Sequence, residues 1–299
     1  MTGSMGFVEI ACPLCESTSH LQHRATDSER RIVVCRHCDL AFVNPQPDDA
    51  YLDAIYARDY YEDNGAGTGY QDYAGLSGLL TQIARKNIAT IAELHPRGGR
   101  LLDVGCATGE FLAVAGDAGW QAEGVELAPD GRQTCQDKGL TVVGERLTDL
   151  PANEQYDVIT YWDVLEHVTN PMLELGEAHR RLASGGLFAT TMPNYGSLRS
   201  LVQRGRWWGF YTSREHLFFF TPRSLAAALE KAGFRVIRTA TTTVDIQPLR
   251  PIKDLVRGRM PFQSGPPPVT YFESRRTFGR LLERANLGHV LFMFAERLP

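Results

Sequence analysis

The chain has 299 residues, of which 43% are hydrophobic and 22% charged, as in an ordinary soluble globular protein. Its net charge of −4 argues against a dedicated nucleic-acid-binding protein, which usually carries a basic excess. No apolar run approaches the roughly 20 residues of a membrane-spanning helix, and no secretory signal is visible. We therefore expect a cytoplasmic protein with no membrane span and no nucleic-acid partner.

Four of the six cysteines form two closely spaced pairs, Cys12 with Cys15 and Cys35 with Cys38. Two thiolates three residues apart on a tight turn can face one ion, and two such turns complete a tetrahedral zinc shell. Two disulfides are the alternative, but a reducing compartment disfavours them. The pattern predicts a small zinc ribbon over residues 1–45, with these four cysteines as ligands. The nearby histidines at positions 20, 23 and 37 are expected at the surface.

Two longer units follow the ribbon. Residues 46–95 are mainly helical in pattern and carry tyrosines at positions 51, 56, 60, 61, 70 and 73, so we expect a Tyr-rich extension of the next domain. In 96–299, short apolar runs at 101–104, 122–125, 141–143, 158–161 and 187–192 alternate with helical segments at 110–118, 129–138 and 171–182. Such alternation predicts an α/β domain with a parallel sheet.

The 245–288 segment interrupts this alternation before a last expected strand at 289–297. It is rich in proline and holds eight basic and four acidic residues, a local charge of +4 in a chain of net charge −4. Its length is unusual for a loop, so we expect a mobile cover, or lid, over an acceptor pocket. The positive charge favours an acceptor that bears phosphate or is bound to a carrier, although a solvated basic face has the same composition.

A glycine-containing turn follows the first strand of the alternation, in Asp103-Val-Gly-Cys-Ala-Thr-Gly109. The two glycines let the backbone approach a ligand closely, and Glu126, after the next strand, is placed to bind two ribose hydroxyls. A dinucleotide fold would instead carry G-x-G-x-x-G. Asp103 would repel a pyrophosphate but suits a cation such as S-adenosylmethionine.

On these motifs the sequence resembles the class I S-adenosylmethionine-dependent methyltransferases. Further similar segments lie at 144–147, 156–168 and 184–188, and 215–222 with 225–234 resembles the branch of ubiquinone-biosynthesis, sugar and natural-product methyltransferases. The resemblance covers about 10–244. It implies a Rossmann-like, seven-stranded, mostly parallel sheet with helices on both faces, preceded by the ribbon. It also implies methyl transfer to a small molecule, such as a sugar or polyketide, with O-methylation favoured over C-methylation.

The resemblance also assigns candidate cofactor contacts. Residues before the first strand are expected to contact the methionine end of the cofactor. The glycine turn and the ends of the following strands are expected to contact the rest of it. The set is Tyr70, Tyr73, Arg85, Asp103, Gly105, Cys106, Gly109, Glu126, Leu127, Glu145, Arg146, Leu147 and Trp162.

Two histidines, His167 and His216, each follow a glutamate and lie where the family places loops over the cofactor's methyl group. Either is a candidate general base. Asp163, Glu166 and His167 are spaced to share a helix face, and the ubiquinone-type relatives hold a divalent metal there. A capping and salt-bridge cluster is the alternative for this trio. The aromatic run at 207–211 forms either the wall of the acceptor pocket or ordinary core.

Two other functions compete with this interpretation. Some RNA methyltransferases also carry a four-cysteine ribbon, but the acidic net charge and the Tyr161-Trp-Asp163 segment after the fourth strand argue against that class. A non-enzymatic binding module is the third alternative. The intact Asp103, Gly105, Gly109 and Glu126 argue against it.

Overall fold

The computed structural model describes residues 6–25, 31–56, 61, 74–204, 207–210, 215–243 and 277–298. The expectations for Tyr70, Tyr73 and residues 245–276 of the basic segment therefore lie outside the described residues. In the part of the chain that is described, none of the helices combines the length and the apolar character of a membrane-spanning helix.

A seven-stranded sheet forms the centre of the molecule, in the order β12-β13-β10-β9-β6-β7-β8. Its strands are β6 (Arg100–Val104), β7 (Gln121–Val125), β8 (Val142–Gly144), β9 (Tyr156–Trp162), β10 (Leu182–Pro193), β12 (Phe234–Thr242) and β13 (Val290–Arg297). The five strands from β6 to β10 pair in parallel, and β13 lies antiparallel between β10 and β12. The expected seven-stranded, mostly parallel sheet is confirmed.

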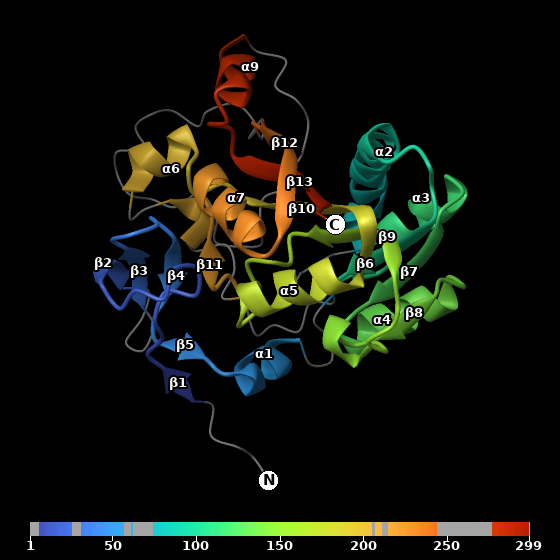
Figure 1. The fold of residues 1–299 in the computed structure, drawn as a ribbon, viewed down its shortest axis with the longest axis horizontal. Coiled ribbons are helices and arrows are strands. Elements are labelled where there is room, and N and C mark those ends of the chain that lie inside the picture. Colours follow the sequence, from blue (N-terminus) through green and yellow to red (C-terminus); the bar gives the residue numbers. More distant parts are fainter. Residues whose placement is uncertain are drawn as a thin grey trace.

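Helices cover both faces of this sheet (Figure 1). On one face, α2 (Ser77–Leu94) and α3 (Glu110–Asp117) pack their apolar residues against β6, β9 and β10. On the other face, α5 (Pro171–Arg181) and α7 (Pro222–Lys231) belong to a larger core that continues into the cysteine-rich segment. The other helices among the described residues are α1 (Asp49–Ile55), α4 (Pro129–Asp137), α6 (Leu198–Gln203) and α9 (Thr277–Arg284), with short 3-10 turns at Ala74–Leu76, Leu147–Asp149 and Trp208–Phe210.

The cysteine-rich segment builds a second sheet that includes a strand from the α/β domain. Its strands β2 (His20–Ala25), β3 (Arg31–Cys35) and β4 (Ala41–Val43) are joined by β11 (Phe218–Phe219), in the order β11-β4-β3-β2. Phe218 pairs with Phe42, and their rings stack with centroids 6.3 Å apart. A separate pair, β1 (Phe7–Val8) with β5 (Gln46–Pro47), ends the segment. The ribbon therefore shares both a sheet and a core with the domain that follows.

The ends of the parallel strands set the position of the site. The carboxyl ends of β6, β7 and β9 lie at one edge of the sheet, because parallel neighbours point the same way. The glycine turn, Glu126 and the segment after Trp162 all leave the sheet at this edge. Residues far apart in the sequence are thereby brought together around one crevice.

Candidate functional site

The four cysteine side chains of the ribbon converge on one point. The Sγ atoms of Cys12 and Cys38 lie 3.4 Å apart, as do those of Cys15 and Cys35, and all four lie within 4.8 Å of one another. None of the four forms a disulfide. Four thiolates around a zinc ion are separated by about 3.8 Å when the Zn–S bonds are about 2.3 Å, so the donor set fits tetrahedral zinc.

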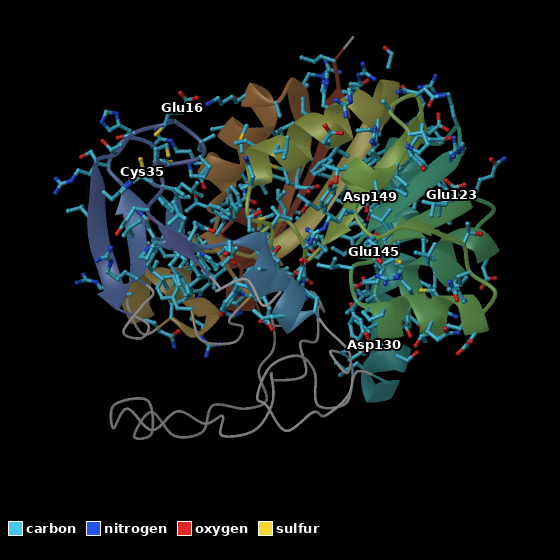
Figure 2. All side chains as sticks on the ribbon, turned by 90° about the horizontal axis from the view of Figure 1, so that it is seen from below. Glu16, Cys35, Glu123, Asp130, Glu145 and Asp149 are labelled. Atoms are coloured by element: carbon cyan, nitrogen blue, oxygen red, sulfur yellow. The ribbon has the colours of Figure 1, made fainter. Side chains whose placement is uncertain are left out.

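This cysteine cluster lies far from the crevice. Cys12 and Cys35 are fully buried, and burial raises the pKa of the Cys12 thiol to about 11. A thiolate at Cys12 therefore needs a cation beside it. Figure 2 shows Cys35 at one end of the molecule, well separated from Glu145 and Asp149.

The turn after β6 is shaped by backbone conformations that glycine adopts easily. Gly105 has a φ of 72°, and a methyl group on its Cα would lie 2.6 Å from a Val164 methyl carbon. Gly109 has a φ of 86° and caps the start of α3. Ala107 between them has a φ of 52°, which costs a residue with a side chain about 1–2 kcal/mol. The turn thus presents backbone amide groups and the start of a helix to the crevice.

Glu126 holds this turn in place. Its two carboxylate oxygens accept hydrogen bonds of 2.8 Å from the backbone N–H groups of Ala107 and Ala128. The side chain is only 3% exposed, and burial raises its pKa against the effect of these donors and of a hydrogen bond with Tyr61. Glu126 therefore ties the ends of β6 and β7 together at the floor of the crevice.

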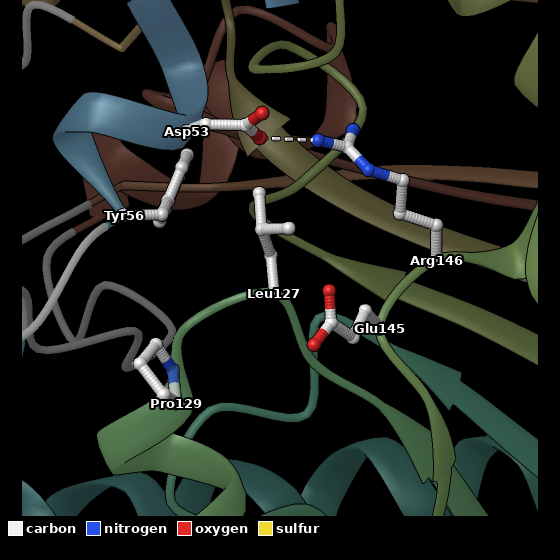
Figure 3. Close-up of a pocket in the computed structure, with 6 residues that line it drawn as sticks. All are labelled: Asp53, Tyr56, Leu127, Pro129, Glu145 and Arg146. Atoms are coloured by element: carbon white, nitrogen blue, oxygen red, sulfur yellow. Dashed lines mark hydrogen bonds and ion pairs between the residues drawn. The ribbon is translucent and has the colours of Figure 1, made fainter. Parts of the chain in front are cut away.

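A pocket of about 270 Å³ opens beside Glu126 (Figure 3). Of the predicted cofactor contacts, Leu127, Glu145 and Arg146 line it. Arg146 forms an ion pair of 2.5 Å with Asp53 on α1 across the opening, and Glu145 pairs with Arg132 at 2.8 Å. The lining also includes Asp53, Tyr56 and Pro129, which the sequence interpretation did not select. The only signal for Tyr56 was the abundance of tyrosines in 46–95.

The floor of the crevice holds a second buried carboxyl group. Asp103 is 2% exposed and accepts a 2.7 Å hydrogen bond from the Thr160 hydroxyl on β9. Burial raises its pKa to about 8. Cys106, one of the predicted cofactor contacts, is buried in the turn, and the buried Cys135 donates a hydrogen bond to the Ala107 carbonyl.

The two histidines predicted at the reaction centre lie against each other after β9. The ring centroids of His167 and His216 are 4.8 Å apart. Together with Glu166 they offer three ligand atoms within 4.8 Å of one another. Both carboxylate oxygens of Glu166 and Nε2 of His167 are buried and have no hydrogen-bond partner among the described residues. We call these three residues the Glu-His-His cluster.

The cluster differs from the predicted trio of Asp163, Glu166 and His167. The segment after β9 forms a turn rather than a helix, and Asp163 has a φ of 55°. The helical spacing therefore does not apply, and Asp163 contributes no atom to the cluster. It still affects Glu166, since burial first and the Asp163 charge second raise the pKa of that carboxyl well above its ordinary value. His216, about fifty positions later, takes the place of the aspartate.

Hydrogen bonds orient both imidazoles in the same way. Nδ1 of His216 lies 3.3 Å from the carbonyl oxygen of Gly209, and Nδ1 of His167 lies 2.6 Å from the hydroxyl of Tyr56. In each ring, Nε2 is therefore the nitrogen that remains for other chemistry. Burial lowers the pKa of His167 well below its ordinary value and also lowers the pKa of His216, so both rings are neutral at pH 7.

The remaining predicted contacts lie elsewhere in the fold. Arg85 is exposed on α2, and Leu147 is buried in the main core. Trp162 packs edge-on against Phe111 at 5.3 Å, and its indole Nε1 is buried without a hydrogen-bond partner among the described residues. From the aromatic run, Trp207 and Phe210 are buried and pack on Phe219.

Comparison with known proteins agrees with this arrangement. Residues 79–239, more than half of the chain, match a family described as a methyltransferase domain. A ubiquinone biosynthesis O-methyltransferase of Cereibacter sphaeroides is 30% identical over 154 residues, which cover 48% of this chain and 62% of that protein. The same-named protein of a Ruegeria species is 30% identical over 173 residues, with coverages of 53% and 70%. This chain thus spans less than two thirds of the first relative's length.

Solved structures show the same fold at low identity. A 1,6-didemethyltoxoflavin-N1-methyltransferase of Burkholderia thailandensis is 16% identical with a TM-score of 0.53, covering 93% of this chain and all of that one. A magnesium protoporphyrin IX methyltransferase of Synechocystis is 15% identical with a TM-score of 0.52, covering 84% of this chain and 100% of that one. From the family match, its relatives and this fold, we conclude that the chain belongs to the class I S-adenosylmethionine-dependent methyltransferases.

Proposed function

We propose that the chain transfers the methyl group of S-adenosylmethionine to a hydroxyl oxygen of a small-molecule acceptor. The observation that carries this proposal is the Glu-His-His cluster, which places two neutral imidazoles at the end of β9. A hydroxyl acceptor must lose a proton as the methyl group arrives, whereas a nitrogen or sulfur acceptor has less need of a base. The relatives named for O-methylation support the same acceptor atom.

The cofactor is proposed to lie across the carboxyl ends of β6 and β7. The pocket lined by Asp53, Leu127 and Arg146 has room for the adenine. Glu126 lies beside it, where a carboxylate can accept hydrogen bonds from both ribose hydroxyls. Asp103 lies on β6 just before the glycine turn, and its pKa of about 8 means that it is mainly protonated at pH 7 in the chain alone. A positive sulfonium bound beside it would favour the carboxylate form. The unpartnered indole N–H of Trp162 is available to an anionic group, such as the methionine carboxylate.

The proton of the acceptor is proposed to pass to His216. The Gly209 carbonyl can only accept a hydrogen bond, so it fixes the proton of His216 on Nδ1 and leaves a lone pair on Nε2. His167 lies against this ring and keeps its own Nε2 toward the same space. Enclosure by buried aromatic residues such as Phe219 keeps water away from the transfer.

The Glu-His-His cluster also fits a divalent metal ion. Glu166 keeps two buried carboxylate oxygens without hydrogen-bond partners in the described structure, and both histidines offer Nε2 while Nδ1 is bonded elsewhere. This is the arrangement in which histidine usually binds a metal. A bound metal would lower the pKa of a coordinated acceptor hydroxyl. We propose Glu166, His167 and His216 as the ligands of such an ion, in place of the trio that includes Asp163. Nε2 of His216 has one lone pair, so His216 acts as the base only in the metal-free chain; with the ion bound it would be a ligand.

The cysteine cluster is proposed to hold one structural zinc ion. Its sulfur geometry and burial support this role, and its distance from the crevice argues against a role in the chemistry. The phosphate-bearing or carrier-bound acceptor remains a prediction, because six of the eight basic residues of 245–288 lie outside the described residues.

Replacing Glu126 with Gln is expected to weaken the binding of S-adenosylhomocysteine about 10- to 100-fold, because a hydrogen bond to a charged group contributes about 1.5–3 kcal/mol. Glu123→Gln is the matched control, since Glu123 lies on β7, which Glu126 directly follows, but pairs with Arg100. Calorimetric titration measures both affinities. Equal affinities in the two variants would exclude the ribose role of Glu126.

Replacing His216 with Asn is expected to reduce turnover about 100- to 10,000-fold while leaving S-adenosylhomocysteine affinity unchanged, because the general base is lost and the cofactor pocket is not. The exposed His37 provides the control variant His37→Asn. The assay follows an isotope-labelled methyl group from the cofactor into a panel of phenols, sugars and their phosphate esters. A label found only on carbon, nitrogen or sulfur would contradict O-methylation.

The zinc content of the purified chain is expected to be about one ion per molecule and to vanish in the Cys35→Ser/Cys38→Ser double variant, because two of four thiolates are lost. Cys135→Ala, which removes a buried cysteine outside the cluster, should retain the zinc. Elemental analysis of the three proteins provides the measurement. Full zinc content in the double variant would show that the four cysteines are not the ligands.

A further inference from the structure

Tyr56 reaches the Glu-His-His cluster from a distant part of the chain. It directly follows α1, and its hydroxyl lies 2.6 Å from Nδ1 of His167, 111 positions later in the sequence. The two rings are tilted, with centroids 6.5 Å apart. Tyr56 also lines the pocket beside Leu127 and Arg146 (Figure 3). One side chain therefore contacts both the histidine pair and the proposed adenine pocket.

The position of the proton on His167 depends on this contact. A tyrosine hydroxyl can either donate or accept a hydrogen bond, so it is compatible with both neutral tautomers of the ring. Nε2 of His167 is buried and has no hydrogen-bond partner among the described residues. A proton on Nε2 would be an unsatisfied buried donor, whereas a proton on Nδ1 is satisfied by the Tyr56 oxygen. The hydrogen bonding thus favours the tautomer that keeps a lone pair on Nε2.

The neighbouring ring gives an independent comparison. The Gly209 carbonyl fixes the same tautomer in His216 through a contact of 3.3 Å at Nδ1. Each ring offers one nitrogen within 4.8 Å of a Glu166 oxygen. Nδ1 is bonded to Tyr56 in His167 and to Gly209 in His216, so Nε2 is the nitrogen that each ring keeps for a cation. If the His167 proton moved to Nε2, this ring could no longer bind a cation beside Glu166.

We propose that Tyr56 is a positioning residue that fixes the Nδ1–H tautomer of His167 and thereby keeps Nε2 available in the Glu-His-His cluster. This inference deepens the proposed function and rests on its assignment of His167 and His216 to the reaction centre. Tyr56 acts through His167 and needs no contact with the acceptor. Only its hydroxyl oxygen is required for this role, because the ring would pack in the same way without it.

Tyr56→Phe tests the role, because it removes that oxygen and keeps the ring. Tyr51→Phe is the matched control, since Tyr51 lies on α1, which Tyr56 directly follows, but packs edge-on against Phe7 at 5.9 Å. Three measurements are made on zinc-loaded full-length protein. They are the tautomer of His167 from nitrogen NMR of its ring, the affinity for Mn²⁺ alone, and the affinity for S-adenosylhomocysteine.

In the wild-type protein and in Tyr51→Phe, we expect His167 to carry its proton on Nδ1. In Tyr56→Phe, we expect this preference to be lost and Mn²⁺ affinity to fall about 10- to 100-fold, as for other outer partners of metal-binding histidines. Both affinities should stay at the wild-type values in Tyr51→Phe, and an unchanged thermal unfolding midpoint in Tyr56→Phe shows that this variant is folded.

An unchanged tautomer in Tyr56→Phe would overturn the inference, as would an equal change in Tyr51→Phe. A loss confined to S-adenosylhomocysteine affinity would also overturn it, since Tyr56 would then act on the cofactor pocket instead. If the wild-type protein binds no Mn²⁺, the metal part of the proposed function fails. The tautomer measurement still decides the role of Tyr56 in that case.

Discussion

The pairing of β11 with the ribbon strand β4 is the interaction on which the arrangement of the site depends. β11 has only two residues and begins two positions after His216. Its first residue, Phe218, is nevertheless buried between Phe42 and the main core. On its other side, the Glu166 carbonyl accepts hydrogen bonds from the backbone N–H groups of Leu217 and Phe218, at 2.8 and 3.1 Å. The ribbon therefore acts as a wall that holds His216 against the turn after β9.

The same pairing shows what a metal ion at the four cysteines would contribute, although the ribbon already belongs to a larger core. Its strands are short, and β2 forms the edge of its sheet. Tight turns at the two cysteine pairs position β3 and β4, and β4 in turn positions β11. A metal ion far from the crevice can thus support the reaction centre through backbone pairing alone, without taking part in the chemistry.

Much of the α/β framework could be predicted from the sequence, because buried strands and amphipathic helices alternate clearly. The segments expected at 110–118 and 129–138 correspond to α3 and α4 within one residue at each end. The cysteine spacing likewise predicted the sulfur cluster. The glycine turn was located because only a few residue types tolerate its conformation, and Glu126 because it ends the adjacent parallel strand.

The other features of the site depend on contacts between distant residues, which leave no local pattern in the sequence. β11 is too short for any periodicity, so the sharing of a sheet between ribbon and domain could not be foreseen. The trio at 163–167 assumed a helix, but Asp163 adopts a left-handed backbone conformation and a turn results. Tyr56 was one tyrosine among many in its segment. Only the fold shows that its hydroxyl reaches His167.

A crystal structure with S-adenosylhomocysteine and Mn²⁺ would test most directly whether the Glu-His-His cluster is the reaction centre. The account predicts the adenine in the pocket between Asp53 and Leu127, and the cofactor sulfur facing His167 and His216. We also expect anomalous scattering from manganese between Glu166, His167 and His216. A cofactor sulfur facing away from both histidines would contradict the account.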